Sequence, residues 1–565
     1  MKLGANQRRG WATRRQFPFV VAVVLIMAMY TIASLSLIRK TGLQYDEALF
    51  VNAATSGGYG SSSSQFVSLR IHGVAVALMP YIGALKAWVW TPIFSLFGVS
   101  LESIRAPAVL LGASAVSLVT AAIWRCTGRV YGLALALLLC TEPVFSLMTR
   151  LDWGPVVIAG FLRAVALYAV IRLATGGGRR WVAIVTSALV LGLFNKLDFG
   201  IFAVAFLLAF GGVFWPVWRS RWKSLRTTFV ACGALMVTAY GIGGLAAMRA
   251  SSVTSGGTQP LSQRIPTILN LISDTFSGVW VAPYITDGNI TTPSHSIYAA
   301  CLLGGLGLIC VGVTGVGLAA RPYYYRRSAA FTNRLTLALI ATAMCMVIGM
   351  AATPQVNGPH HAIAIWPLPQ VIAVLGIAIV AGSIETAWVR RILVVLAVTI
   401  LSLSIANQMV TSLEIRQALS RPHSSSLIWT TEIQNLTDGV DQAVRMSDVH
   451  VVIVTDWGIG NQIAALATTP TIIGEAAPNH NLQNTLVVFD YWSLFYNQAD
   501  PNMILQSAGI KFGERFLLAS HSLGKPILVD ELSVKALVGE CVRRGGVVPT
   551  DLFSGKALQL RLVQC

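Results

Sequence analysis

A series of long apolar runs constrains this chain more than any other feature. The first run, FPFVVAVVLIMAMYTIASLSLI, covers residues 17–38 and contains no charged residue. A helix needs about 20 apolar residues to cross a membrane. Charged residues make up only 11% of the chain and hydrophobic residues 55%, whereas roughly 25% of a soluble domain is charged. The lipid bilayer must therefore be the main solvent of the folded chain.

The apolar runs predict eleven membrane-spanning helices and an uncleaved N-terminal anchor. The basic segment RRGWATRRQ precedes the first run, as in a signal peptide, but the run is longer than a usual signal core and no A-x-A site follows it. The predicted spans are 17–38, 103–123, 130–148, 154–174, 181–195, 199–218, 227–248, 297–320, 335–352, 362–382 and 391–411.

The distribution of basic residues predicts the orientation of these spans. With residues 1–16 in the cytoplasm, the cytoplasmic segments hold 20 Lys and Arg residues and the opposite loops before residue 412 hold 8. Cytoplasmic loops carry such an excess. The net charge of +18 is then mostly a topology signal, so a nucleic-acid partner is not expected. Eleven spans place the C-terminus outside the cytoplasm.

The composition predicts two domains. Residues 1–412 form a transmembrane domain, whose first outer loop, 39–102, carries an interfacial helix at 80–98. Residues 413–565 hold 14 acidic and 11 basic residues, and the long apolar runs end there. In this part VHVVIVTDWGIGNQIAALA reads as a strand, a turn and a helix, so we expect an α/β domain outside the membrane. The expected fold class is a polytopic α-helical membrane protein with this extracytoplasmic domain.

Acidic residues gather on the predicted outer face. Nine precede residue 412, and only Glu385 falls on the cytoplasmic side. Because Asp and Glu contribute little to topology, this grouping suggests a site at the outer face. The alternative is that these residues are simply solvated in loops.

Four stretches of the chain resemble the GT-C membrane glycosyltransferases, a group that includes protein O-mannosyltransferases and the aminoarabinose transferases acting on lipid A. They are YDEALFVNAA, LFGVSLESIRAPAVLLGASAV, SLMTRLDWGPVVI and LVLGLFNKLDFGIF. The resemblance covers residues 17–220 well and is weaker over 221–411, where GPHHAIAIWPLPQVIAVLG resembles a late helix of the family. It implies transfer of a sugar from a polyprenyl-phosphate donor to an acceptor hydroxyl on the outer face, in one inverting displacement.

The resemblance predicts three catalytic carboxylates, Asp46, Glu47 and Asp152. Asp46 occupies the first acidic position of the family motif and is the expected base, since an acceptor hydroxyl needs a carboxylate in hydrogen-bond reach. Glu47 would orient the acceptor, bind a metal or cap the following helix; alternatively, both residues simply favour a helix N-terminus. Asp152 is expected to face Asp46 and to hold the acceptor or, with Asp46, a divalent metal such as Mg, Mn or Zn; the alternative is an N-terminal cap.

Basic groups or a metal must stabilise the departing phosphate of such a donor. Lys196 could contact this phosphate or form a local pair with Asp198, which we also place among the substrate-binding residues. Arg105 matches an arginine of the family and could neutralise the phosphate or pair with Glu102.

Further candidates lie in other segments. Arg70 and His72 share the outer loop of the acidic pair. The tandem His360 and His361 precede a predicted span and could contact the acceptor or a metal. Arg163 lies near the middle of its span, where an arginine is costly, and we expect a structural pair or snorkelling there.

Two alternative functions stay open on the sequence alone. One is a transporter or flippase of lipid-linked glycans, and the other is a non-catalytic scaffold of the cell envelope. The expected location is a bacterial inner membrane, among membrane lipids. The sequence does not specify the sugar, or whether the acceptor is a lipid, a glycan or a protein. Cys541 and Cys565 either form a disulfide or remain two free thiols.

Overall fold

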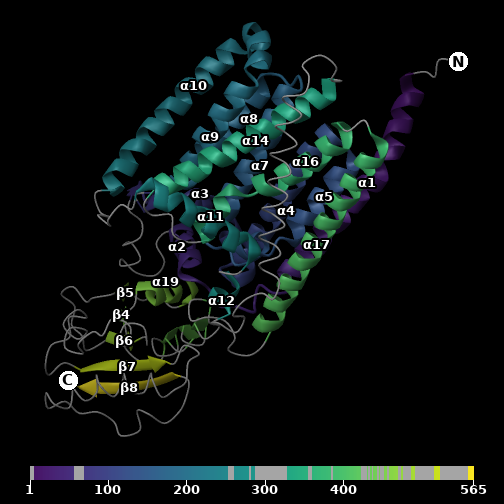
Figure 1. The fold of residues 1–565 in the computed structure, drawn as a ribbon. Coiled ribbons are helices and arrows are strands. Elements are labelled where there is room, and N and C mark those ends of the chain that lie inside the picture. The colour runs from purple at the N-terminus through teal and green to yellow at the C-terminus, as the bar shows by residue number, and fades with distance from the viewer. Residues whose placement is uncertain are drawn as a thin grey trace. The chain divides into compact units, whose positions relative to one another are not determined.

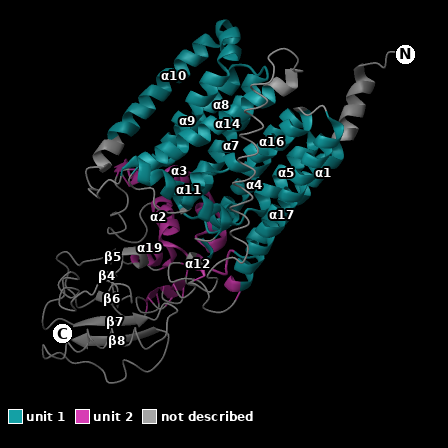
Figure 2. Ribbon diagram, in the orientation of Figure 1, with its two compact units in different colours: residues 1–37, 105–284, 288–417 teal, residues 38–104, 285–287, 418–565 magenta. Residues whose placement is uncertain are grey.

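The structure is a computed structural model of the chain. It describes residues 5–55, 69–79, 81–251, 260–278, 281–286, 327–353, 359–383 and 386–420, and beyond them shorter pieces that include helix α19 and five strands. By internal contacts the chain divides into two units (Figure 2). Unit 1 comprises residues 1–37, 105–284 and 288–417, and unit 2 comprises residues 38–104, 285–287 and 418–565.

Unit 1 consists of long apolar helices, which make the protein a multi-pass membrane protein. Within the described ranges, six helices are long and apolar enough to cross a membrane, or seven if one bent pair counts as a single span. The six spanning stretches are Phe17–Leu35, Leu101–Thr127, Val156–Ala174, Trp215–Leu245, Phe331–Ala352 and Ala387–Leu419. They belong to helices α1 (Ala5–Leu35), α4 (Leu101–Thr127), α7 (Val156–Ala174), α10 (Trp215–Ser251), α14 (Arg327–Ala352) and α17 (Ala387–Leu419).

Three further predicted spans correspond to helices of 15 to 17 residues. These are α8 (Arg179–Asn195), α9 (Phe199–Val213) and α16 (Leu368–Ser383). The predicted span 297–320 lies outside the described residues. The total of eleven spans therefore stays a prediction.

The predicted span 130–148 is broken in its C-terminal half. Helices α5 (Arg129–Thr141) and α6 (Pro143–Arg150) meet at a bend of 60°. Pro143 disfavours the helical conformation of the residue before it, and Glu142 is extended. The Glu142 carboxylate accepts hydrogen bonds from the N–H groups of Val144 and Phe145, at 3.0 and 2.6 Å. This acidic residue is therefore a helix cap.

The basic segment 219–226, which the predicted spans 199–218 and 227–248 leave as a loop, is helical. Helix α10 begins at Trp215 and runs through it without a break. The prediction was wrong because basic residues indicate the side of the membrane, while Lys and Arg themselves are good helix formers.

A column of aromatic rings runs along α9 and into α10. Neighbouring ring centroids lie between 4.4 and 5.9 Å apart. The column consists of Phe199, Phe202, Phe206, Phe210, Phe214 and Trp218. Arg163 of α7 lies over the first two rings, at 5.7 and 5.9 Å from their centroids. Cation–π contacts thus accommodate this intramembrane arginine.

Helices α1, α5, α16 and α17 lie alongside one another within unit 1 (Figure 1). Ala373 and Ile377 of α16 pack against Tyr131 of α5 and against α17. Thr141 at the end of α5 donates to Gln408 of α17 at 2.8 Å. Two further helices, α11 (Leu261–Ser277) and α12 (Val281–Ile285), lie between the predicted spans 227–248 and 297–320.

Unit 2 joins the first predicted outer loop to the C-terminal part of the chain. Helix α2 (Tyr45–Ala54) packs on α19 (Trp457–Leu466), and Asn52 donates to the backbone oxygen of Asn461 at 3.0 Å. A small antiparallel sheet of β1 (Leu69–Ile71), β2 (Val74–Met79) and β3 (Ile82–Gly83) precedes α3 (Leu85–Phe97). Helix α3 coincides with the predicted interfacial helix.

The C-terminal strands form a five-stranded sheet in the order β5-β4-β6-β7-β8. Its strands are β4 (Val451–Val454), β5 (Ile472–Gly474), β6 (Thr485–Phe489), β7 (Arg515–His521) and β8 (Leu558–Gln564). All neighbouring pairs are parallel except β7 and β8. Strand β4 and helix α19 occupy the segment predicted as strand, turn and helix. That this part lies outside the membrane stays a prediction, and Cys541 and Cys565 are outside the described residues.

Candidate functional site

A cluster of ionisable groups lies in unit 1 where α8 ends and α9 begins. Lys196 is the C-cap of α8 and Asp198 the N-cap of α9, so the short turn between the helices brings the two side chains together. Lys196 Nζ lies 3.0 Å from Asp198 Oδ2. His361, from α15 (Pro359–Ala362), places Nδ1 at 3.5 Å from both atoms. Three of the predicted substrate-binding residues therefore meet, although His361 is 165 positions from Lys196.

The charged groups of this cluster are Lys196 and Asp198, and the two histidines are neutral. Burial by itself raises the pKa of Asp198, but the charge of Lys196 and the hydrogen bond with His361 outweigh it, so that the pKa lies below its usual value. Burial lowers the pKa of His361, and the charge of Lys196 lowers it further, against the opposing effect of Asp198. Burial likewise lowers the pKa of His360. Both histidines are thus neutral at pH 7 and do not repel Lys196.

The turn that carries Asp152 is attached to this cluster. The ring of Trp153 lies 5.2 Å from that of His360, whose ring in turn lies 4.2 Å from that of His361. Asn195 Nδ2 donates to the backbone oxygen of Pro155 at 3.0 Å. Asp152 itself is fully buried and adopts a positive φ of 49°, a conformation that Asp tolerates better than most residues.

Acid is expected to destabilise the cluster. The folded-state pKa values of Asp198, His360 and His361 all lie below their usual values, so each group contributes stability above its unfolded-state pKa and loses it as the pH falls. For the histidines this loss begins below about pH 6.5. We expect the melting temperature of the purified protein to fall between about pH 6.5 and pH 5, and to fall less in the His360→Gln/His361→Gln variant. The same fall in both proteins would assign the pH dependence to other groups.

The acidic pair of the first outer loop begins helix α2 in unit 2. Gln44 is the N-cap, and its side-chain oxygen accepts from the N–H of Asp46 at 2.7 Å. Glu47 Oε2 accepts from the N–H of Gln44 at 2.9 Å, which completes a capping box. Glu47 is fully buried, whereas Asp46 is partly exposed. Glu47 therefore caps α2 through its carboxylate, and Asp46 contributes its backbone N–H to the cap; the catalytic roles of both residues stay predictions.

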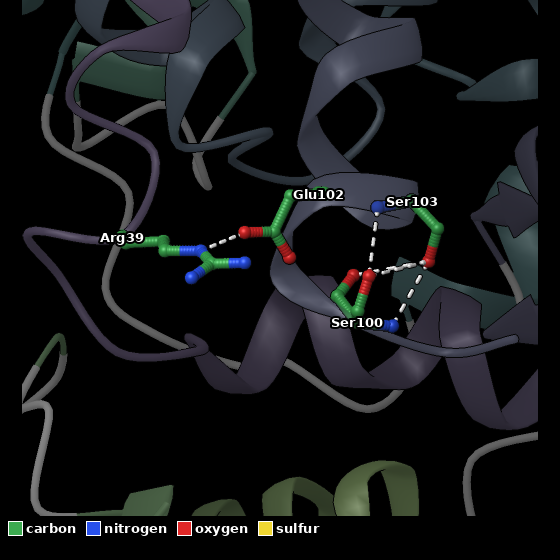
Figure 3. Close-up of polar contacts among 4 residues, drawn as sticks. All are labelled: Arg39, Ser100, Glu102 and Ser103. Carbon is green, nitrogen blue, oxygen red and sulfur yellow. Dashed lines mark hydrogen bonds and ion pairs between the residues drawn. The ribbon is translucent and has the colours of Figure 1, made fainter. Parts of the chain in front are cut away.

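Glu102 forms an ion pair with Arg39, which the sequence did not predict (Figure 3). Ser100 and Ser103 bond each other reciprocally at the start of α4: the N–H of Ser100 donates to Ser103 Oγ at 2.9 Å, and the N–H of Ser103 to Ser100 Oγ at 3.2 Å. This cap sets the first turn of the helix on which Glu102 lies. The alternative pairing of Glu102 with Arg105 is not the one observed, and Arg105 is fully buried.

Arg70 and His72 lie at the turn between β1 and β2. His72 and Gly73 both have positive φ, as a two-residue hairpin turn of type I′ requires. Arg70 Nη1 donates to the backbone oxygen of Gly73 at 3.0 Å. The observed contact of Arg70 is thus local to the hairpin, and a substrate-binding role of either residue stays a prediction.

Two buried cations were not among the predicted site residues. Arg150, at the end of α6, is 5% exposed, and its Nε and Nη2 have no hydrogen-bond partner among the described residues. Arg105 is near enough to repel it electrostatically. Lys86 of α3 is 1% exposed, with Nζ 4.4 Å from the centre of the Phe50 ring. A usable signal for Arg150 was its position two residues before Asp152 in the motif TRLDWGP.

The predicted metal site has two carboxylate ligands, Asp46 and Asp152. Within the described ranges, no three His, Cys, Asp or Glu side chains gather closely enough to hold a metal ion. Asp46 belongs to unit 2 and Asp152 to unit 1. That the two carboxylates face each other, and that a metal joins them, stay predictions.

Comparisons with known proteins agree with the motifs. Residues 83–240 match the family model described as Dolichyl-phosphate-mannose-protein mannosyltransferase. The crystal structure of ArnT from Cupriavidus metallidurans in the apo state superposes with a TM-score of 0.50 at 11% identity, over 90% of this chain and 93% of that one. The structure of the same protein bound to undecaprenyl phosphate gives a TM-score of 0.47 at 13% identity, over 88% and 92% of the two chains. No curated protein matches the chain. The family match over residues 83–240 and the apo ArnT fold confirm the resemblance that the motifs indicate: the chain is a polytopic membrane protein with a fold similar to that of ArnT, and part of it is similar to mannosyltransferases.

Proposed function

We propose that the chain transfers a sugar from a polyprenyl-phosphate donor to an acceptor hydroxyl at the outer face of a bacterial inner membrane, with inversion. The observation that carries this proposal is the meeting of Lys196, Asp198 and His361 beside the turn of Asp152. Of these residues, Lys196, Asp198 and Asp152 fall within the part of the chain that matches the mannosyltransferase family.

The cations of unit 1 suit a phosphate leaving group. An ammonium has three donors, so Lys196 can keep its contact with Asp198 and still donate to a phosphate oxygen. Arg150 is buried beside the like charge of Arg105 and retains two guanidinium nitrogens without a partner in the described structure. An anion bound there would relieve both the repulsion and the unsatisfied donors.

The helix cap uses the carboxylate of Glu47 but the backbone N–H of Asp46, and this difference supports Asp46 as the base. Glu47 holds the N-cap of α2 through its carboxylate. Asp46 takes part in the same cap through its N–H and is the more exposed of the two. In the proposed displacement, Asp46 accepts the proton of the acceptor hydroxyl as its oxygen attacks the anomeric carbon. The bond from that carbon to the phosphate oxygen breaks, and its electrons leave with the polyprenyl phosphate.

A transfer assay with the purified full-length protein tests the proposal. Polyprenyl-phosphate sugars, radiolabelled in the sugar, are offered in proteoliposomes together with a membrane extract as the source of acceptors. We expect free polyprenyl phosphate and labelled acceptor to appear in equal amounts. Movement of the intact donor across the bilayer without release of polyprenyl phosphate would instead support a flippase. Neither release nor movement, with a stably folded protein, would support a scaffold.

A further inference from the structure

A groove lies between α9 and α10, away from the ionisable cluster. Its volume is about 630 Å³, and its walls include Leu208, Gly211 and Gly212 of α9 together with Trp215 and Trp222 of α10. A Cβ atom built on Gly211 or Gly212 would meet nothing within 4 Å. The two glycines therefore leave the groove open and are not required by close packing against a neighbour.

Tryptophan rings place one end of this groove at the level of lipid headgroups. Trp215 is 59% exposed and Trp222 47% exposed, and exposed tryptophans on membrane helices concentrate at the membrane–water interface. Beyond them, Val230 and Leu235 of α10 are exposed and apolar. The groove thus opens toward hydrocarbon on one side and toward the interface on the other.

Two exposed arginines share the groove-lining face of α10. Arg219 follows Trp215 by four positions and Arg226 follows Trp222 by four, a spacing that places each arginine on the same face as its tryptophan. Arg221 differs, because it donates to the backbone oxygens of Leu173 and Gly177.

These arginines have no nearby acidic partner in the sequence. The chain contains no Asp or Glu between residues 199 and 273. In the described part of unit 1, no ion pair involves either Arg219 or Arg226. The groove therefore combines an apolar wall with an uncompensated positive edge, on the face that the basic residues predict to be cytoplasmic.

We infer that this groove binds an anionic phospholipid of the surrounding membrane. One acyl chain lies along the wall formed by Leu208, Gly211 and Gly212, and the headgroup phosphate contacts Arg219 and Arg226. Basic pockets between membrane helices on the cytoplasmic side recognise anionic headgroups in this way. A second copy of the chain is a poorer occupant, since its own α10 would bring the same positive charges together.

Native mass spectrometry of the full-length protein tests this inference. The protein is purified in detergent and offered equal amounts of phosphatidylglycerol and phosphatidylcholine with identical chains. We expect the wild-type protein to retain phosphatidylglycerol preferentially. In the Arg219→Ala/Arg226→Ala variant, the ratio of bound phosphatidylglycerol to bound phosphatidylcholine should fall about tenfold. Gly212→Leu fills the groove from a position with open space around it, so it should fold normally and lose bound lipid.

The matched control is Arg390→Ala/Arg391→Ala, which removes the same charge from two exposed arginines at the start of α17. It should retain phosphatidylglycerol like the wild-type protein. An equal loss in this control, or equal retention of both lipids by the wild-type protein, would overturn the proposal. A dimer that dissociates in Gly212→Leu would likewise overturn it, in favour of a second copy in the groove.

Discussion

Asp46→Asn is expected to lower sugar transfer by roughly 10² to 10⁴-fold, the usual contribution of a general base. The amide keeps the shape of the side chain but cannot accept the proton of the acceptor hydroxyl. The helix cap should survive, because Asp46 contributes its backbone N–H to it. We therefore expect an unchanged melting temperature and nearly unchanged donor binding, measured on the same purified protein with a non-transferable donor analogue.

Glu47→Gln is the matched control for this prediction. A glutamine oxygen can still accept from the N–H of Gln44, since Gln serves as well as Glu in a capping box. Its transfer rate should stay within a few-fold of the wild-type rate. Full activity in Asp46→Asn would exclude Asp46 as the base, and a large loss in Glu47→Gln instead would assign that role to Glu47.

Lys196→Met is expected to reduce kcat/KM for the donor by roughly 10² to 10³-fold, the usual cost of removing one group that stabilises a developing negative charge. The substitution preserves the length of the side chain and removes its charge. It also leaves the Asp198 carboxylate without the ammonium at 3.0 Å, so stability should fall by about 1–3 kcal/mol. Transfer kinetics and denaturant unfolding of the same preparation measure the two effects.

The double variant Lys196→Met/Asp198→Asn separates function from stability. Removing both charges leaves no buried charge unpaired, and such replacements are often neutral for stability. We expect the double variant to regain most of the lost stability and none of the lost activity. If activity returns together with stability, the pair between Lys196 and Asp198 is only structural, and the donor phosphate is neutralised elsewhere.

Most of the membrane part could be predicted from the sequence because apolar length is a direct physical requirement for crossing a bilayer. The break between α5 and α6 was visible as Pro143, but a count of apolar residues passes over a single proline. The helical course of residues 219–226 was missed for a different reason. Charge reports the side of the membrane, and it says nothing of whether the backbone there is a loop or a helix.

The candidate site was predicted as separate residues rather than as a cluster. Lys196, Asp198 and His361 were each identified from their own segments, but their meeting depends on how the ends of α8, α9 and α15 pack. Trp153 and Asn195 were not identified, because an aromatic ring and an amide carry no signature of chemistry by themselves. The pair of Arg39 with Glu102 was also missed, since the nearer Arg105 was the more obvious partner in the sequence.

The ring column of α9 has a mechanical consequence. Its rings pack successively along the helix and continue to Trp218, and densely packed side chains transmit displacement instead of absorbing it. A helix stiffened along its length can tilt or slide, but it resists bending. Any movement of Asp198 at one end of α9 is therefore expected to be accompanied by movement of Gly211 and Gly212 at the other.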